Sequence, residues 1–322
     1  MRVLITGGAG FIGSNLTEHL LGLEQVQLVR VMDNFSTGNQ KNIEAFASNP
    51  KFEFIQGDIR DYQSCLAAVK DIELVSHQAA LGSVPRSIND PLTTNEVNIT
   101  GTLNIFTAAK ESGVKRVVYA ASSSTYGDHP GLPKEEDKIG SPLSPYAVTK
   151  FVNELYANVF AKLYGLNTVG LRYFNVFGPK QNPQGPYAAV IPLFIKAVLN
   201  NEPPTINGDG EHSRDFTFVR NAVHANELAL FTSNPNAMNQ VYNIATGART
   251  SLNEVFEMIK EVAGSDLSPR YGPEREGDVK HSLASIVKAG ELLNYQPHVQ
   301  LKDGLKLTFE WYRSLHHFSY ST

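Results

Sequence analysis

The sequence predicts an α/β fold, a doubly wound parallel sheet of the Rossmann type with a smaller, interleaved C-terminal domain. Strand-like apolar runs recur along the first half of the chain, helix-like segments separate most of them, and a glycine-rich turn follows the first run. The expected strands are Arg2–Thr6, Leu28–Asp33, Phe52–Gln56, Leu74–Gln78, Arg116–Ala121 and Thr168–Tyr173, and the clearest helices between them are Leu92–Glu111 and Pro145–Tyr164.

The glycine-rich turn has the spacing Gly7-x-x-Gly10-x-x-Gly13, with Phe11 and Ile12 inside it and a helix-like segment after it. A helix N-terminus has unpaired N–H groups and a positive dipole end, so it can hold a pyrophosphate. Glycines let that group approach the backbone closely. A glycine trio alone is also compatible with an ordinary turn.

The second strand ends in Asp33, about 20 residues after this turn. A carboxylate there can accept hydrogen bonds from a ribose 2′-OH and would repel a 2′-phosphate, which favours NAD over NADP as the cofactor. The alternative is a turn residue at the end of a strand.

Four strand ends carry small or polar residues suited to a binding site. Parallel strands bring their carboxyl ends to one edge of a sheet, where ligands bind. The four segments are Asp33-Asn34-Phe35-Ser36, Gly57-Asp58-Ile59-Arg60, Gln78-Ala79-Ala80-Leu81-Gly82-Ser83 and Ser122-Ser123-Ser124-Thr125-Tyr126-Gly127.

A second domain is expected after Tyr173, where the chain becomes rich in Pro, Gly, Asn and Gln. The chain returns to the first domain near Phe216–Phe231 and Val241–Ile244, so the boundary is interleaved. We assign residues 1–174, with returning segments near 216–244, to a cofactor-binding domain, and residues 175–215 and 245–322 to a substrate-binding domain. Helices are expected there at Ala189–Leu199, Leu252–Val262, Ala284–Leu293 and Asp303–Ser314.

Composition excludes several classes of protein. With 322 residues and a net charge of −4, the chain has no broad cationic field, so nucleic acid is not an expected partner. Its one cysteine, Cys65, excludes an intrachain disulfide and a Cys-rich metal site; we expect it to be buried, and we expect no metal. No signal-like or membrane-spanning run is found, and we expect a soluble, cytoplasmic protein.

The segment Ser144-Pro145-Tyr146-Ala147-Val148-Thr149-Lys150 carries the candidate chemistry. Pro145 suits the first turn of a helix, so Tyr146 and Lys150 lie four residues apart on one helical face. A nearby ammonium favours the phenolate and should lower the pKa of Tyr146, as a general base requires. An isolated Y-x-x-x-K pattern is also compatible with a core tyrosine beside a solvated lysine.

Together these motifs resemble the extended short-chain dehydrogenase/reductase family, and within it the NAD-dependent nucleotide-sugar epimerases. The resemblance spans nearly the whole chain. It rests on Thr6-Gly7-Gly8-Ala9-Gly10-Phe11-Ile12-Gly13, Asp58-Ile59-Arg60-Asp61, Ser122-Ser123-Ser124-Thr125-Tyr126-Gly127, Tyr146-Ala147-Val148-Thr149-Lys150, Arg172-Tyr173-Phe174-Asn175-Val176-Phe177-Gly178-Pro179, Gly208-Asp209-Gly210, Ser213-Arg214-Asp215-Phe216 and Arg275-Glu276-Gly277-Asp278-Val279.

The resemblance implies a catalytic trio in which Tyr146 is the base, Lys150 tunes it and Ser122 bridges it to substrate. It implies that NAD is bound by Gly7, Gly10, Phe11, Ile12, Gly13, Asp33, Asn34, Asp58, Ile59, Gln78, Ala79, Ala80, Tyr146 and Lys150. It implies that a UDP-sugar is bound by Ser83, Ser122, Ser123, Ser124, Tyr146, Asn175, Ala189, Val190, Asn207, Arg214, Arg275, Asp278 and Ser282. The sequence does not resolve which serine of the triplet is the bridge.

Within the epimerases, the likeness points to enzymes that act on UDP-N-acetylglucosamine and form homodimers through the helices Leu92–Glu111 and Pro145–Tyr164. Ser282 matches a position where relatives restricted to plain sugars carry a tyrosine. Alternatives are a UDP-glucose or UDP-glucuronate 4-epimerase, a decarboxylase, for which Arg86 keeps the option open, a 4,6-dehydratase, which Ser123-Ser124 disfavours, and a non-catalytic NAD-binding module.

Overall fold

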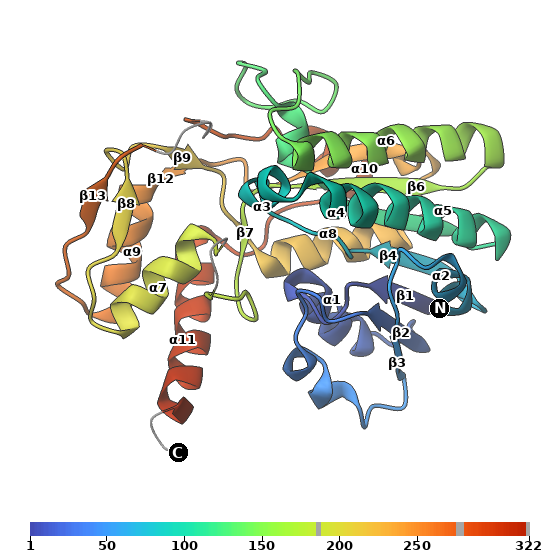
Figure 1. Cartoon of the computed structure of the whole chain (residues 1–322), viewed down its shortest axis with the longest axis horizontal. Coiled ribbons are helices and arrows are strands. Elements are labelled where there is room, and N and C mark those ends of the chain that lie inside the picture. The colour runs from blue at the N-terminus through green and yellow to red at the C-terminus, as the bar shows by residue number, and fades with distance from the viewer. Residues whose placement is uncertain (185–187, 275–279, 320–322) are drawn as a thin grey trace.

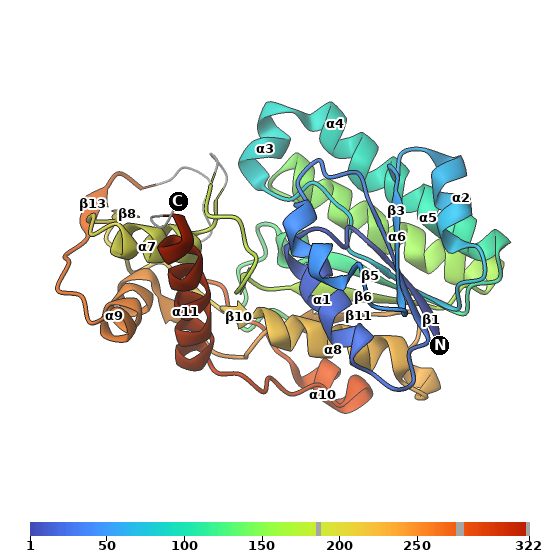
Figure 2. The same ribbon diagram turned by 90° about the horizontal axis from the view of Figure 1, so that it is seen from below.

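The structure is a computed structural model that describes residues 1–184, 188–274 and 280–319. Its centre is a parallel sheet covered by helices on both faces (Figures 1 and 2). Within the described residues the sheet has seven strands in the order β11-β6-β5-β4-β1-β2-β3. Their bounds are β1 (Arg2–Thr6), β2 (Leu28–Asp33), β3 (Phe52–Gln56), β4 (Leu74–His77), β5 (Arg116–Ser122), β6 (Thr168–Tyr173) and β11 (Gln240–Ile244).

This strand order positions the site. The chain moves outward from β1 to β2 and β3 on one side and from β4 to β5 and β6 on the other. The carboxyl ends of β1 and β4 therefore flank the point where the order reverses, which is where ligands bind in open α/β sheets. The prediction of a doubly wound parallel sheet is confirmed.

Alternating strand residues build two separate layers of core. Val3 and Ile5 of β1 pack with Leu16 of α1, whereas Leu4 packs in a second cluster with Ile105 of α5. One face of the sheet carries α1 (Phe11–Leu21), α8 (Val219–Phe231) and α10 (Val287–Leu293), and the other carries α2 (Tyr62–Val69), α5 (Gly101–Glu111) and α6 (Pro145–Tyr164).

Helix α6 has the predicted bounds because both of its ends are specified locally. The Ser144 hydroxyl accepts the Ala147 N–H at 3.1 Å, and Pro145 occupies the first turn. Gly165 ends the helix in the left-handed conformation, with φ +68°. These caps place Tyr146 in the first turn of a long, rigid element.

The predicted helix Leu92–Glu111 is interrupted. It consists of α4 (Pro91–Asn95), the π-helical turn η3 (Glu96–Thr100) and α5. The wider turn directs Asn98 toward the β4–α3 loop, where its amide accepts the Leu81 N–H at 2.8 Å and donates to the Leu81 carbonyl at 3.0 Å. Periodicity alone does not reveal a π turn, because the apolar pattern continues through it.

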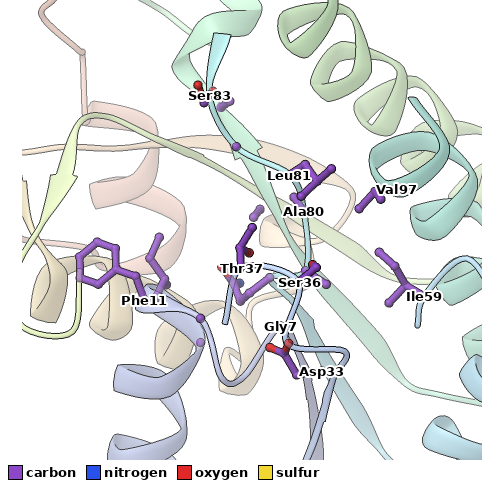
Figure 3. Close-up of a pocket in the computed structure, with 18 of the residues that line it drawn as sticks. Gly7, Phe11, Asp33, Ser36, Thr37, Ile59, Ala80, Leu81, Ser83 and Val97 are labelled. Atoms are coloured by element: carbon purple, nitrogen blue, oxygen red, sulfur yellow. The ribbon is translucent and has the colours of Figure 1, made fainter. Parts of the chain in front are cut away.

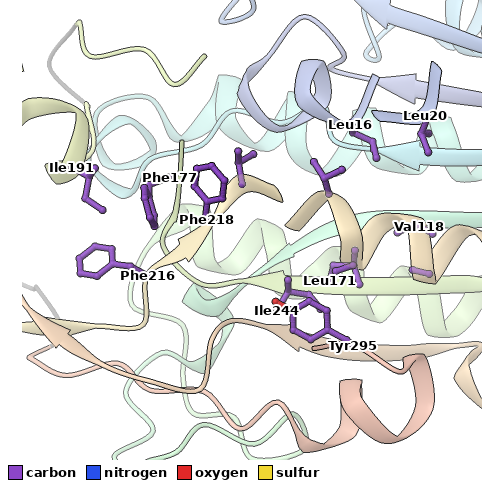
Figure 4. Close-up of a cluster of buried hydrophobic side chains, with 14 of the residues drawn as sticks. Leu16, Leu20, Val118, Leu171, Phe177, Ile191, Phe216, Phe218, Ile244 and Tyr295 are labelled. Carbon is purple, nitrogen blue, oxygen red and sulfur yellow. The ribbon is translucent and has the colours of Figure 1, made fainter. Parts of the chain in front are cut away.

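A smaller lobe lies beside the sheet, on the left in Figure 1. Phe177 of β7 and Phe218 of β10 lie where this lobe meets the sheet and join both sides in one hydrophobic cluster (Figure 4). The elements here are β7 (Val176–Phe177), α7 (Val190–Leu199), β8 (Thr205–Asn207), β9 (Ser213–Arg214), β10 (Thr217–Phe218), β12 (Thr250–Ser251), α9 (Leu252–Ala263), β13 (Arg270–Gly272) and α11 (Leu301–Ser319).

The exact domain boundaries stay a prediction. Strand β11 and helix α8 join the sheet, as the returning segments require. Helix α10 also contacts β11 and α8, although it belongs to the range assigned to the second domain. Helix α11 runs beyond the predicted end at Ser314 to Ser319. The remaining short elements are η1 (Gln40–Asn42), η2 (Glu44–Phe46), α3 (Val84–Asn89), η4 (Ser123–Tyr126) and η5 (Pro235–Ala237).

In the described part of the chain, no helix combines the length and apolar character needed to cross a bilayer.

Candidate active site

The glycine turn between β1 and α1 is closed so tightly that side chains would not fit. A Cβ on Gly13 would lie 2.2 Å from the Gly7 carbonyl oxygen, and a Cβ on Gly7, where φ is +70°, would lie 2.7 Å from the Ala79 backbone. Gly10 is the N-cap of α1 and has no side chain that could cap the helix. No acidic residue lies in the first turn of α1. This cradle fits the diphosphate of a dinucleotide, which can approach the N–H groups directly.

A cleft of about 480 Å³ opens above this turn (Figure 3). All fourteen residues predicted to bind the cofactor line it: Gly7, Gly10, Phe11, Ile12, Gly13, Asp33, Asn34, Asp58, Ile59, Gln78, Ala79, Ala80, Tyr146 and Lys150. Among the described lining residues, the charged side chains are Asp33, Asp58 and Lys150. The helix N-terminus must therefore provide most of the attraction for a diphosphate.

Asp33 is a buried carboxylate fixed by the backbone. Its oxygens accept the Ala9 N–H at 2.9 Å and the Phe35 N–H at 2.8 Å. Burial raises the pKa of Asp33, and these two hydrogen bonds act in the opposite direction. Asp33 lies close to Gly7 at one end of the cleft (Figure 3), where a ribose hydroxyl could reach it.

Asp58 and Ile59 follow β3, the strand next to β2, and also line the cleft. Asp58 accepts the Asn34 amide at 2.9 Å and pairs with Arg60, whose guanidinium lowers the pKa of Asp58 to about 2. The Cys65 thiol donates to the Ile59 carbonyl at 3.2 Å. As predicted, Cys65 is buried, and burial raises the pKa of its thiol to about 12.

The loop after β4 is held by the π turn. Asn98 binds both backbone groups of Leu81 and donates to the Thr149 hydroxyl at 3.1 Å. Ser83 caps α3 with φ +91°, outside the usual range for a residue with a side chain. Ser83 lies at the far end of the cleft from Asp33 (Figure 3).

Ser122, at the end of β5, lines this cleft together with Tyr146 and Lys150 of α6. The Ser122 hydroxyl lies close enough to the Tyr146 phenol to favour the phenolate, which acts to lower the pKa of Tyr146. The Lys150 ammonium lies 5.9 Å from the centre of the Tyr146 ring and donates to the Ala120 carbonyl at 2.7 Å. Burial lowers the pKa of Lys150 to about 8.

The expectation that the protein lowers the pKa of Tyr146 is wrong for this arrangement. Burial raises the pKa of Tyr146, and the Ser122 hydroxyl only partly opposes that effect. The physical reason is burial, because desolvation penalises the charged phenolate. The Lys150 ammonium donates to the Ala120 carbonyl at 2.7 Å.

The serine triplet divides in the structure. Ser122 ends β5 and lines the cleft, whereas Ser123 and Ser124 belong to η4 and are not among the described lining residues of either cavity. The Ser124 hydroxyl donates to the Ser122 hydroxyl at 2.9 Å. Of the three, Ser122 is the one that reaches Tyr146.

A second cavity of about 500 Å³ lies in the smaller lobe and shares Asn175 with the first. The predicted residues Val190, Asn207 and Arg214 line it, with the apolar walls of Phe194 and Leu252, among others. Arg214 donates to the carbonyls of Ser213 at 3.0 Å and Lys280 at 3.2 Å. Asn175, which lines both cavities, therefore places them next to each other.

Besides Ser123 and Ser124, two further predicted substrate residues lie outside both cavities. Ala189 is the N-cap of α7, next to Val190, and Ser282 donates its N–H to the Ser213 carbonyl at 3.0 Å, beside Arg214 in β9. Neither is a described lining residue. Arg275 and Asp278 lie outside the described residues.

Sequence reasoning missed several lining residues. Gln181 lines the first cavity, and Lys196 and His212 line the second. Gln181 lies in the stretch rich in Pro, Gly, Asn and Gln that marked the second domain, so that composition was a usable signal. Lys196 resembles any exposed helical lysine, and only the packing of α7 reveals its position.

The fold and the cleft are those of an enzyme of the extended short-chain dehydrogenase/reductase class. The same cleft is lined by a glycine turn that fits a dinucleotide and by Ser122, Tyr146 and Lys150. Residues 3–245 match the family described as the NAD dependent epimerase/dehydratase family. The chain belongs to this family, and NAD is its cofactor.

Relatives cover nearly the full length of the chain. A putative UDP-glucose 4-epimerase of Methanocaldococcus jannaschii is 40% identical over 97% of this chain and 98% of its own length. The solved UDP-N-acetylglucosamine 4-epimerase of Methanobrevibacter ruminantium, in complex with UDP-N-acetylmuramic acid, is 40% identical with a TM-score of 0.92 and covers 98% of both chains. The UDP-glucuronic acid 4-epimerase of Bacillus cereus, solved with UDP-glucuronic acid and NAD, is 33% identical with a TM-score of 0.90, over 98% of this chain and 100% of its own.

Proposed function

We propose that this protein is a UDP-hexose 4-epimerase that interconverts UDP-N-acetylglucosamine and UDP-N-acetylgalactosamine. One observation carries the proposal: Ser122, Tyr146 and Lys150 line the cofactor cleft, and Asn175 lines both this cleft and the second cavity. A sugar attached to a nucleotide in the second cavity can reach the trio, while NAD occupies the first.

The second cavity suits a uridine diphosphate. Its apolar wall, including Phe194 and Leu252, can take the base, and Arg214 offers a guanidinium that matches diphosphate oxygens. Asn175, Val190 and Asn207 are proposed contacts in the same cavity. Arg275 and Asp278 remain proposed contacts from the family resemblance.

In the proposed mechanism Tyr146 moves the proton and Ser122 positions the sugar. The Tyr146 phenolate takes the proton of the sugar C4 hydroxyl as C4 loses hydride, and the C4–O bond becomes a carbonyl. The sugar then turns about its link to the diphosphate, hydride returns to the opposite face, and Tyr146 returns the proton. The residues that line the cofactor cleft, from Gly7 to Lys150, would hold NAD, and NAD would supply a reversible hydride acceptor, so that the cycle would consume no oxidant.

The structure bears on how Tyr146 reaches its phenolate form. Because burial raises the pKa of Tyr146, the protein needs positive charge close to the phenol during turnover. The Lys150 ammonium is the cationic side chain at this end of the cleft among the described lining residues. Replacing Tyr146 by phenylalanine removes the base and should reduce kcat by about 10² to 10⁴.

The test of the reaction is product analysis by NMR after incubation with UDP-N-acetylglucosamine. Formation of UDP-N-acetylgalactosamine by the unmodified protein, and its loss in Tyr146→Phe with NAD still bound, is the expected result. Wild-type turnover in Tyr146→Phe would remove that residue from the mechanism. A net 4-keto or decarboxylated product would replace the epimerase by another enzyme of the family.

The preference for acetylated sugars is supported by the relative from Methanobrevibacter ruminantium. Ser282, which is not a described lining residue of either cavity, is proposed as the gate from the family resemblance alone. Ser282→Tyr is expected to reduce kcat/KM for the acetylated pair while sparing UDP-glucose and UDP-galactose. Overpacking of this kind commonly costs about 1 to 3 kcal/mol. An unchanged ratio between the two sugar pairs would exclude Ser282 as the gate.

A second candidate is epimerisation of plain or uronic sugars. The relatives from Methanocaldococcus jannaschii and Bacillus cereus favour it, because their names specify UDP-glucose and UDP-glucuronic acid. Parallel assays with the three UDP-sugars distinguish the candidates by their relative kcat/KM.

We also propose a homodimer formed by the outer helices. Leu92 of α4 and Leu155 and Leu163 of α6 are 77%, 50% and 69% exposed, which is unusual for leucine on neighbouring helices. A second copy of the same face would cover them in a two-fold interface.

A further inference from the structure

Helix α6 carries a buried carboxylate, Glu154, in line with Tyr146 and Lys150. Glu154 follows Lys150 by four residues, so the three side chains lie on one helical face. Lys150 is 3% exposed and Glu154 is 8% exposed. A charged residue so deeply buried needs a specific partner.

That partner is Arg172 of β6. Its Nε and Nη2 donate to the two carboxylate oxygens of Glu154 at 2.9 and 2.7 Å. Arg172 is itself 3% exposed and donates to the Glu136 carbonyl at 2.9 Å. The two hydrogen bonds therefore fix the orientation of both side chains and connect α6, which carries Glu154 and Lys150, to the sheet, which carries Arg172.

The same pair holds the turn that follows Ser122. In η4, the Thr125 hydroxyl donates to Glu154 at 3.4 Å, and the Tyr126 ring lies 4.7 Å from the Arg172 guanidinium carbon. Ser122 is the N-cap of η4 and accepts the Ser124 N–H at 3.2 Å. The pair therefore contacts elements on both the lysine and the serine side of the trio.

We propose that Glu154 is a positioning residue whose negative charge keeps Lys150 in its ammonium form and whose contacts fix the turn after Ser122. The proposal rests on the proposed function, in which Lys150 assists the Tyr146 phenolate. Glu154 acts through Lys150 and η4 and does not line the cleft.

The charges around Lys150 explain why one carboxylate matters. Among the described residues packed near it, Glu154 is the anion whose charge raises the pKa of Lys150, against burial, which lowers it. His77 of β4 is held neutral by burial. The titratable groups that interact with Lys150 are Tyr146 and Glu154 of α6 and His77 of β4. Tyr119 of β5 and Arg172 of β6 interact with Glu154.

Removing the charge should release the lysine proton at lower pH. Glu154→Gln keeps the shape but removes the negative charge that opposes the effect of burial on Lys150. Removing a neighbouring opposite charge commonly moves a pKa by about 1 to 3 pH units. The pH above which activity is lost should therefore lie about one pH unit or more lower in the variant than in wild type, and activity should return as the pH is lowered further.

The experiment has one readout that is independent of turnover. The side-chain resonances of Lys150, identified by their absence in Lys150→Arg, are titrated by NMR in wild type, Glu154→Gln and Glu154→Asp. The pH profile of kcat is measured in parallel. Glu53→Gln is the matched control, because Glu53 pairs with the buried Arg30 at 3.0 Å and lines neither cavity.

The proposal predicts a lower Lys150 titration in Glu154→Gln, a smaller shift in Glu154→Asp and none in Glu53→Gln. An unchanged Lys150 titration in Glu154→Gln, with activity reduced equally at every pH, would overturn it and leave Glu154 a structural residue. If Glu154→Gln does not fold, an unchanged titration in Glu154→Asp overturns the proposal equally. If wild type epimerises no UDP-sugar, the proposed function fails while the NMR titration still decides the role of Glu154.

Discussion

Gly13→Ala tests the cradle that the glycine turn forms for NAD. The added Cβ would lie 2.2 Å from the Gly7 carbonyl oxygen and 2.8 Å from both the Gly7 carbonyl carbon and the Gly8 Cα. These contacts are with backbone, so the turn itself must move. Overpacking of this kind costs about 1 to 3 kcal/mol, and if the displaced turn is the one that binds the diphosphate, NAD affinity should fall by about 5- to 150-fold.

Gly22→Ala is the matched control at the other end of the same helix. A Cβ there meets its nearest neighbour, the His19 carbonyl, at 3.4 Å, and the backbone is already helical with φ −80°. NAD affinity should stay at the wild-type value. The assay is calorimetric titration of protein stripped of nucleotide, with thermal unfolding to confirm that each variant folds. Wild-type NAD affinity in Gly13→Ala would refute the tight cradle.

Three further predictions follow from burial and exposure. Cys65, buried with its thiol pKa raised to about 12, should resist iodoacetamide at neutral pH and react only in denaturant; rapid labelling of native protein would contradict its placement. Burial lowers the pKa of His77 to about 3, so as pH falls below 6.5 the unfolded state takes up a proton that the folded state does not. Stability should therefore fall by about 2 kcal/mol between pH 7.5 and 5 in urea titrations, and His77→Gln should lack this component; equal pH dependence in both proteins would exclude it. Leu163→Glu should convert a dimer to monomer in sedimentation at micromolar concentration, whereas Val287→Glu, on the exposed part of α10, should not; a wild-type monomer would contradict the proposed interface.

The sheet could be predicted from the sequence because each of its first six strands is a short apolar run with a turn signal after it. Helix α6 could be predicted to the residue, since Ser144, Pro145 and Gly165 specify its ends. The cofactor cleft followed from the same information. Once the strands are parallel, their carboxyl ends must meet at one edge.

Other features could not be predicted, because they depend on distant contacts. The π turn in η3 arises where Asn98 binds Leu81, and the apolar periodicity does not register it. The pKa of Tyr146 depends on how deeply its ring is buried and on where Lys150 directs its proton, which the four-residue spacing does not reveal. The place of Ser282 could not be predicted either, because the match of a residue to a position in the family does not determine whether its side chain lines a cavity.

The position of β11 has a consequence for how the chain is made. A ribosome that has delivered residues up to Tyr173 has released six strands, and β6 is then an open sheet edge with unpaired N–H and C=O groups. Strand β11, which covers that edge, emerges only after β7, α7 and α8 have been synthesised. Since open edges template aggregation, a chain ended after Tyr173 exposes such an edge until Gln240–Ile244 arrives. The elements β7 and α7 of the smaller lobe are therefore synthesised while this edge of the sheet is still open.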